Sequence, residues 1–196
     1  MKIGVVGKSE ANKTVKQLYE AFIKTDKRVA VRSISYRNND FFTTEFAEEL
    51  TFGGNQIRID RLVISEDISP RIGAYDVVIV DDIDYNTDEL IIHGNPVIIA
   101  NSDNGAIMQL LAKNKINRDR IITYGLNNKA SITASSIDES MLFCCIQRSF
   151  KAINGETLMQ QEFSLPIANA AAGVYTSLSS IAAALVCEPG LIEKIG

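Results

Sequence analysis

The chain has 196 residues, of which 46% are hydrophobic and 22% are charged, and its formal net charge is −4. This length and composition are typical of one folded domain and argue against intrinsic disorder. The acidic balance argues against nucleic-acid binding, which depends on Lys and Arg neutralising phosphates. No apolar run is long enough for a membrane span, and the first residues lack the features of a signal peptide. We therefore expect a cytoplasmic protein that binds neither nucleic acid nor a membrane.

The three cysteines are Cys144, Cys145 and Cys187. An odd number, with two of them adjacent in an apolar stretch, does not suggest a disulfide framework. We predict buried, reduced thiols. One histidine and no Cys-x-x-C sequence leave little material for a zinc site.

The first half of the chain begins with a run of small and apolar residues that predicts a buried strand over 2–7. Apolar residues at helical spacing predict a helix over 13–24, and alternation predicts a strand over 28–35. Thr43 or Thr44 is a candidate cap for a short helix that ends at Leu50.

The middle of the chain carries short β-branched runs, which are typical of strands with both faces covered. These runs are 62–64, 77–80, 96–100 and 120–124. A helical stripe between the last two predicts a right-handed parallel crossover. It consists of Ala106, Ile107, Leu110 and Leu111.

The last part of the chain predicts antiparallel strands at 130–137, 141–150 and 157–164, with a hairpin turn at Asn154-Gly155. An Ala-rich helix over 170–187 and a short final helix follow. The fold prediction is an α/β domain in three layers, of the P-loop type. It has a mostly parallel sheet, helices on both faces and an antiparallel β-hairpin extension.

The segment after the first predicted strand resembles a phosphate-binding loop. From Gly7 to Thr14 it reads G-x-x-x-x-N-K-T, so it matches G-x-x-x-x-G-K-[ST] except for Asn12. In this reading, backbone N–H groups face phosphate oxygens, Lys13 neutralises the terminal phosphates, and the Thr14 hydroxyl holds Mg²⁺. Asn is among the few residues that adopt the backbone conformation of that glycine. The alternative is an ordinary strand-to-helix turn with a solvated lysine.

Phosphate chemistry also needs an acid for the metal, and three carboxylates follow predicted strands. Asp81 and Asp82 close the strand at 77–80, and Glu66 follows the strand at 62–64. A carboxylate at a strand end suits a Mg²⁺ ligand. The alternative for each is a solvated acid that caps a nearby helix.

Several segments, in order, resemble the central domain of the Mur ligases, the enzymes of peptidoglycan precursor synthesis. Residues 121–134 are the most specific, because they are similar to the family pattern "itfGlnnkAdvtA". The other segments are 99–104 ("vNaDDp"), 43–50 ("TTPealeL"), 64–69 ("lEvSS"), 165–166 with 181–185 ("LPGxhNvyNalAAiaaAl"), and the loop at 7–14 ("GTNGKT"). The branch that the sequence resembles most is the tripeptide synthetase type.

The resemblance implies an ATP-dependent acid–amino acid ligase whose central domain binds ATP and Mg²⁺. Matched position by position, the loop residues Gly7, Lys8, Ser9, Asn12, Lys13 and Thr14 would contact phosphate. Thr14 and Glu66 would hold Mg²⁺, with Lys13 and Glu66 as the catalytic residues, and Asp81 would then be the poorer metal candidate. Asn127 would contact adenine, and Thr43 and Thr44 would lie on the substrate side.

The sequence also departs from the family pattern. The metal-binding histidine of "NisPDH" is absent from residues 82–87, and Glu45 replaces the proline of "TTP". We expect a single domain over 1–196, without the family's N-terminal substrate domain and C-terminal domain. Two hypotheses follow. The chain is a nucleotide-binding, ligase-like domain that needs a partner protein for the missing domains, or it is a non-catalytic binding or scaffold module.

Overall fold

The computed structural model describes most of the residues of the chain. They are 1–7, 10–24, 27–37, 40–44, 56–63, 71–72, 74–83, 90–114, 116–138, 141–166 and 173–190.

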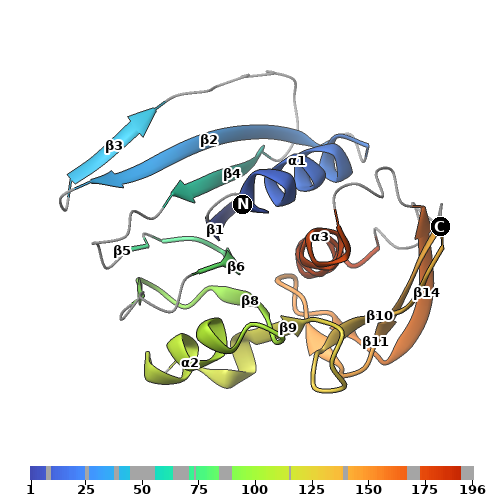
Figure 1. The fold of residues 1–196 in the computed structure, drawn as a ribbon. Helices are drawn as coiled ribbons and strands as arrows, with labels where there is room; N and C mark the ends of the chain where they lie inside the picture. The colour runs from blue at the N-terminus through green and yellow to red at the C-terminus, as the bar shows by residue number, and fades with distance from the viewer. Residues whose placement is uncertain are drawn as a thin grey trace.

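The described residues form a central sheet of ten strands (Figure 1). Its order is β14-β11-β10-β9-β8-β6-β1-β4-β2-β3. The strands are β1 (Lys2–Gly7), β2 (Arg28–Arg37), β3 (Asp40–Thr44), β4 (Gln56–Val63), β6 (Val77–Asp82), β8 (Val97–Asn101), β9 (Ile121–Tyr124), β10 (Ile132–Ile137), β11 (Met141–Ile146) and β14 (Gln161–Pro166). From β2 to β10 every neighbouring pair is parallel, whereas β3, β11 and β14 are antiparallel to their neighbours.

Helices cover both faces of the sheet. On one face, α1 (Glu10–Ile23) and α3 (Val174–Cys187) pack against each other and against β1, β6, β8 and β9. On the other face, α2 (Gly105–Lys113) packs on β8. Alternate residues of one strand therefore enter different cores: Val77 and Ile79 lie on the α1/α3 side, and Val78 and Val80 on the α2 side. This confirms the predicted three-layer α/β fold.

The predicted helical stripe lies in α2, where Ala106, Ile107, Leu110 and Leu111 are buried. Asn104 caps this helix, because its side-chain oxygen accepts hydrogen bonds from the backbone N–H groups of Ala106 (3.0 Å) and Ile107 (3.2 Å).

The antiparallel extension is also present. β11 pairs with β10 and β14, and because β10 pairs with β9 the extension continues the main sheet. The predicted Asn154-Gly155 turn connects two short strands, β12 (Phe150–Lys151) and β13 (Thr157–Leu158), and Gly155 has a φ of 88°. A further short parallel pair consists of β5 (Arg71–Ile72) and β7 (Ile91–Ile92).

Several elements differ from the prediction. The strand predicted over 157–164 is two strands, β13 and β14, in different sheets, and the strand predicted over 141–150 ends at Ile146. α1 begins at Glu10 instead of residue 13. β4 begins at Gln56 instead of residue 62: Ile57 and Ile59 of this strand belong to the α1/α3 core, and the charged residues Arg58 and Asp60 alternate with them. Thr43 and Thr44 belong to the edge strand β3, which the sequence did not predict. The remainder of the helix predicted there, and the short final helix, lie outside the described residues.

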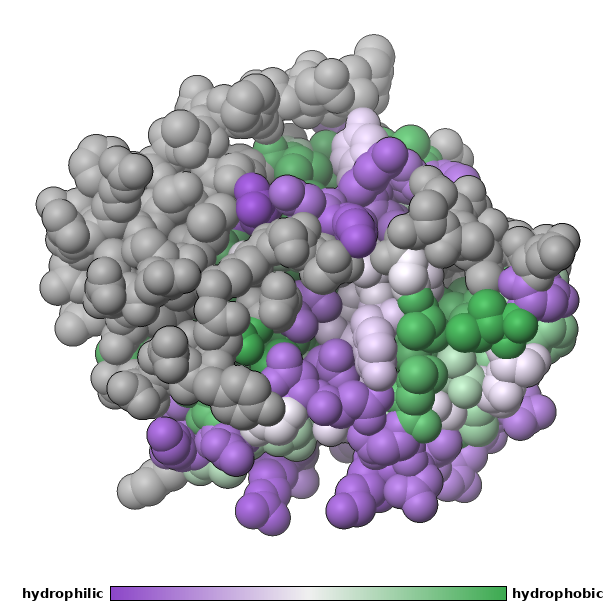
Figure 2. Space-filling view, in the orientation of Figure 1, coloured by the Kyte–Doolittle hydropathy of each residue, from purple (hydrophilic) through white to green (hydrophobic). Residues whose placement is uncertain are grey.

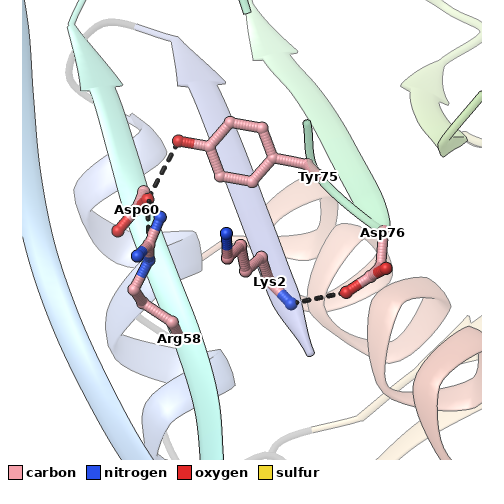
Figure 3. Close-up of polar contacts among 5 residues, drawn as sticks. All are labelled: Lys2, Arg58, Asp60, Tyr75 and Asp76. Carbon is pink, nitrogen blue, oxygen red and sulfur yellow. Dashed lines mark hydrogen bonds and ion pairs between the residues drawn. The ribbon is translucent and has the colours of Figure 1, made fainter. Parts of the chain in front are cut away.

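A buried polar cluster joins β4 to the segment that precedes β6 (Figure 3). The Asp60 side chain is fully buried. It accepts hydrogen bonds from the Tyr75 hydroxyl (2.9 Å) and from Arg58 Nε (3.1 Å), and Arg58 Nη2 lies 2.9 Å from the same oxygen. The backbone N–H of Lys2 donates to Asp76 (2.7 Å). The Asp60 contacts join β4 to the segment before β6, because a buried charge requires partners, and the exposed Lys2–Asp76 hydrogen bond joins β1 to the same segment.

The surface divides into polar and apolar parts. In Figure 2, hydrophilic side chains line the edge that carries α2 in Figure 1, and an apolar patch lies toward the side that carries β10, β11 and β14. Ile137 and Phe143 are exposed residues of β10 and β11. Within the described part of the chain, no helix has the length and hydropathy of a membrane span.

Candidate functional site

The candidate site lies at the carboxyl edge of the parallel strands. β1 occupies the position between β4 and β6, and the chain first passes to one side of β1, forming β2 and β4, before it forms β6 on the other side. In open α/β sheets, this reversal of strand order leaves a crevice outside the carboxyl ends of the strands, where ligands bind. The N-terminus of α1, the end of β6 and the loops after β8 and β9 all lie at this edge.

The connection between β1 and α1 is short. β1 ends at Gly7, which is buried, and α1 begins at Glu10, so only residues 8–9 lie between them. Asn12, Lys13 and Thr14 are therefore helical, and Asn12 does not need the backbone conformation of a glycine. Asn12 and Lys13 are exposed, whereas Thr14 is fully buried. A phosphate here would face the positive, N-terminal end of α1.

Four buried polar side chains from four elements form one hydrogen-bonded network. The Thr14 hydroxyl on α1 donates a short hydrogen bond to Asp81 Oδ2 at the end of β6. The Tyr124 hydroxyl on β9 donates to Asp81 Oδ1 (2.7 Å). Ser179 Oγ on α3 lies 3.2 Å from Thr14 Oγ1 and donates to the Thr176 carbonyl oxygen (3.0 Å). Asp81 is only 7% exposed, so these hydroxyls replace the water that an exposed carboxylate would bind.

A second cluster ties the loop after β9 to the loop after β8. Asn127 Nδ2 donates to Ser102 Oγ (2.8 Å) and to Asp103 Oδ1, and its Oδ1 accepts from the backbone N–H of Lys129 (2.7 Å). The backbone N–H of Leu126 donates to Asp103 Oδ2 (2.6 Å). Hydrogen bonds at both the nitrogen and the oxygen of the side-chain amide thus fix the orientation of Asn127.

Gly125 permits this close approach of the two loops. A Cβ atom at Gly125 would lie 2.7 Å from Ser102 Oγ and 2.8 Å from Asp103 Oδ2. Because hydrogen bonds hold both of those side chains, a larger residue would displace them.

The charge of Asp103 is stabilised by this arrangement. Partial burial alone would raise the pKa of the Asp103 carboxyl, but hydrogen bonds from the Leu126 N–H and the Asn127 amide lower it below its usual range. Tyr175, at the start of α3, has a raised pKa because of partial burial, the nearby charge of Asp103 and a hydrogen bond to that carboxylate. The site therefore presents a fixed negative charge at this edge.

The two clusters are separated along the sheet. The order β1-β6-β8-β9 places β9, which precedes the Asn127 loop, three strand spacings, or about 14 Å, from β1, which precedes α1. This span is comparable with the length of a nucleoside triphosphate. Thr43 and Thr44 lie three spacings from β1 in the opposite direction, in β3. Lys8, Ser9 and Glu66 lie outside the described residues.

The structure brings Thr14 and Asp81 together but gives them partners that the sequence did not assign. Tyr124, Ser179, Ser102 and Asp103 were not predicted as site residues. One signal was present for Tyr124, because it stands where the quoted Mur ligase pattern has phenylalanine. The added hydroxyl needs a partner when it is buried, and Asp81 provides it.

Comparison with known proteins supports the fold. No protein-family model matches this chain, and no curated protein sequence is significantly similar to it. Among solved structures, a murein peptide ligase from Psychrobacter arcticus superimposes with a TM-score of 0.57 at 12% identity, over 97% of this chain and 44% of that one. A UDP-N-acetylmuramate:L-alanyl-γ-D-glutamyl-meso-diaminopimelate ligase from Neisseria meningitides has a TM-score of 0.54 at 10% identity, over 100% of this chain and 65% of that one. The chain thus spans less than two thirds of either enzyme, and it shares the α/β fold of the Mur ligases.

Proposed function

We propose that this chain is a nucleotide-binding domain of the Mur ligase type, which binds a nucleoside triphosphate together with Mg²⁺ at the carboxyl edge of its sheet. One observation carries the proposal: Thr14 in the second turn of α1 and Asp81 at the carboxyl end of β6, which are distant in sequence, are hydrogen-bonded to each other beside β1. In this arrangement the start of α1 attracts phosphate oxygens, and Lys13, which is exposed, lies within the first turns of that helix.

The residues present suit Mg²⁺. Mg²⁺ prefers hard oxygen donors and keeps several waters, so it usually takes one or two protein ligands together with substrate phosphates. Thr14 supplies a hydroxyl and Asp81 a carboxylate; both are buried and hydrogen-bonded to each other, so a bound Mg²⁺ would have to displace that contact. Among the described residues no group of three or more acidic, His or Cys side chains forms a metal cage, which is consistent with a site that phosphates complete. Glu66 is a further candidate ligand outside the described residues.

The roles of the chain's own residues follow from these positions. The N-terminus of α1 and Lys13 bind the phosphates, and Thr14 and Asp81 hold Mg²⁺, which would neutralise phosphate charge when bound. The loops after β8 and β9, fixed by Asn127, form the side on which the base would lie. Thr43 and Thr44 are proposed for the acid substrate.

A complete ligase reaction requires closure around the reacting groups to exclude water. Because this chain spans 44% of one structural relative and 65% of the other, we propose that residues 1–196 correspond to the ATP-binding domain. The remaining parts of an acid–amino acid ligase would come from outside residues 1–196, and a partner protein is one candidate source of them.

A second candidate is a non-catalytic binding or scaffold module. Two observations favour it: only residues 8–9 connect β1 to α1, and both polar atoms of Asn127 are already hydrogen-bonded within the protein. A connection this short does not have the length of a loop that encloses a phosphate group.

Titration calorimetry with ATP, in the presence and absence of Mg²⁺, tests the proposal. We expect Mg²⁺-dependent binding that Lys13→Ala weakens about tenfold or more, the effect of losing roughly 1.4 kcal/mol of phosphate attraction. Lys16→Ala is the matched control, because Lys16 is an exposed lysine of the same helix that lies 4.0 Å from Glu20. No binding at millimolar ATP would contradict the proposal and leave the scaffold module as the better account.

A further inference from the structure

Three cationic side chains lie near the amino-terminal ends of neighbouring strands, at the edge of the sheet opposite the candidate site. They are Lys2 in β1, Arg58 in β4 and Arg28, the first residue of β2. Lys2 pairs with Arg58, and Arg58 pairs with Ala30 on its other side. Arg28 lies two residues before Ala30, so all three cations share one face of the sheet, and the residues that alternate with them enter the α1/α3 core on the opposite face. Figure 3 shows Lys2 and Arg58 on the same side of the strands. The strand spacing and the rise per residue place the Cα atoms of Arg28 and Arg58 about 8 Å apart, so both side chains can reach one small ligand.

Two of these cations have no anionic partner. Arg28 is half-buried, and its Nε atom is buried without a hydrogen-bond partner. Lys2 is exposed, and among the residues that the structure describes no carboxylate lies within ion-pair distance of its ammonium group or of the Arg28 guanidinium. A buried guanidinium nitrogen without a partner is unfavourable, so this position suits an anion that is not part of the chain.

The third cation, Arg58, is held in place by Asp60. Its Nε and Nη2 atoms lie 3.1 Å and 2.9 Å from Asp60 Oδ2. A guanidinium has five N–H donors, so Arg58 keeps donors for a ligand after these two contacts, and its side chain is 33% exposed. The other carboxylate nearby, Asp76, accepts from the backbone N–H of Lys2. Three cations and two carboxylates leave this cluster with one net positive charge, in a chain whose net charge is −4.

We propose that Lys2, Arg28 and Arg58 form a binding site for a phosphate group, carried by free phosphate or by a small phosphate monoester. The planar fork of an arginine matches the oxygens of a phosphate, and a lysine adds a point charge. A phosphate dianion offers enough oxygens for three cationic groups, whereas a carboxylate has only two. This site is separate from the candidate nucleotide site, because β1 extends about 16 Å from Lys2 to Gly7. The inference therefore stands independently of the proposed nucleotide binding.

The experiment titrates the ¹⁵N-labelled chain with inorganic phosphate, methyl phosphate and acetate at pH 7.5, with NaCl keeping the ionic strength constant. The backbone amide signals of Lys2, Arg28 and Arg58 report binding at this cluster, and those of residues 10–14 report any phosphate at the start of α1. We expect saturable shifts at the cluster with phosphate and none with acetate. Arg28→Gln should raise the phosphate Kd of the cluster about tenfold, because one charged donor is lost. Arg120→Gln is the matched control, because Arg120 is an exposed arginine of the short helix before β9, and it should bind phosphate as the wild type does.

Each outcome has a defined meaning. Saturable shifts with both phosphates assign the cluster to phosphate monoesters as well as the free ion, and shifts with inorganic phosphate alone assign it to the free ion; either result supports the proposal. Equal shifts with acetate, or shifts confined to residues 10–14, would overturn it. An unchanged Kd in Arg28→Gln would also overturn it. If Arg28→Gln does not fold, Lys2→Gln, which changes an exposed side chain, must show the same loss of phosphate binding.

Discussion

Two adjacent serines of α3 should respond to the same substitution in opposite directions. Ser180 is 6% exposed, and its hydroxyl oxygen has no hydrogen-bond partner among the described residues. Ser179 is fully buried, but its hydroxyl donates to the Thr176 carbonyl oxygen at 3.0 Å and lies 3.2 Å from the Thr14 hydroxyl. Replacement by alanine removes the same atom at each position, so the difference reports the hydrogen bonds.

The expected magnitudes follow from those partners. In Ser180→Ala, alanine is the better helix former by about 0.5 kcal/mol, and the loss of an unpaired buried hydroxyl adds about 1–3 kcal/mol. We expect the free energy of unfolding to rise by about 2 kcal/mol. In Ser179→Ala, the lost hydrogen bonds cost about 1–2 kcal/mol, and the gain in helix propensity offsets about 0.5 kcal/mol. We expect a net loss of about 1 kcal/mol.

Urea unfolding and thermal unfolding, each monitored by circular dichroism, measure the free energies of unfolding and the Tm values. In a chain of this size about 1 kcal/mol shifts Tm by about 2–4 °C, so the two variants should differ by about 6–12 °C. The urea m-value should stay constant, since neither change alters the surface exposed on unfolding. A Ser180→Ala variant that is less stable than the wild type would refute the reasoning, because it would show that this hydroxyl has a partner in solution.

Three further predictions concern other polar groups. Tyr75→Phe should lower the free energy of unfolding by about 1.5–3 kcal/mol in urea melts, because the buried Asp60 carboxylate loses a hydrogen bond of 2.9 Å; an unchanged midpoint would contradict the cluster in Figure 3. Asp103→Asn should lower the pKa of Tyr175 toward its ordinary value, because the negative charge that opposes ionisation is removed; absorbance titration against a Tyr175→Phe reference measures the change. Burial raises the pKa of Cys144 to about 12, so iodoacetamide should not label it in the folded chain at pH 8, and labelling should appear only on unfolding or as the pH approaches that value.

The strands that the sequence predicted well are those with both faces covered. β6 and β8 consist of continuous β-branched runs, because α1 and α3 cover one face and α2 the other. β4 was predicted only at its end. Its first residues alternate isoleucine with charged residues. No neighbour of Asp60 in the sequence indicates that its side chain is fully buried. Tyr75, which hydrogen-bonds Asp60, lies 15 residues further along the chain.

For the candidate site, too, only those residues that belong to a pattern within one segment could be singled out from the sequence. Thr14 is the last residue of the loop motif, and Asp81 directly follows a predicted strand, so both were candidates on local patterns alone. The residues that complete the network depend on contacts between distant segments: Tyr124 lies 43 residues from Asp81, and Ser179 lies 165 residues from Thr14. Short patterns contain no information on such pairs. The start of α1 at Glu10 was missed because a motif was read as a loop, whereas the residues themselves are acceptable in a helix.

The buried carboxylate of Asp81 gives the sharpest distinction between the two functions. It lies beside the positive end of α1, so phosphate approaching that helix meets attraction from the N–H groups and repulsion from the carboxylate. A divalent cation between them removes the repulsion. Asp81→Asn should therefore change two affinities in opposite directions: metal-free ATP binds more tightly, because the repulsion is lost, and Mg²⁺–ATP binds more weakly, because a metal ligand is lost. Each change should be about threefold to tenfold by calorimetry. Loss of a structural network would instead lower both affinities together. An Asp81→Asn chain in which both affinities fall by the same factor would assign Asp81 to the fold and would favour the scaffold module.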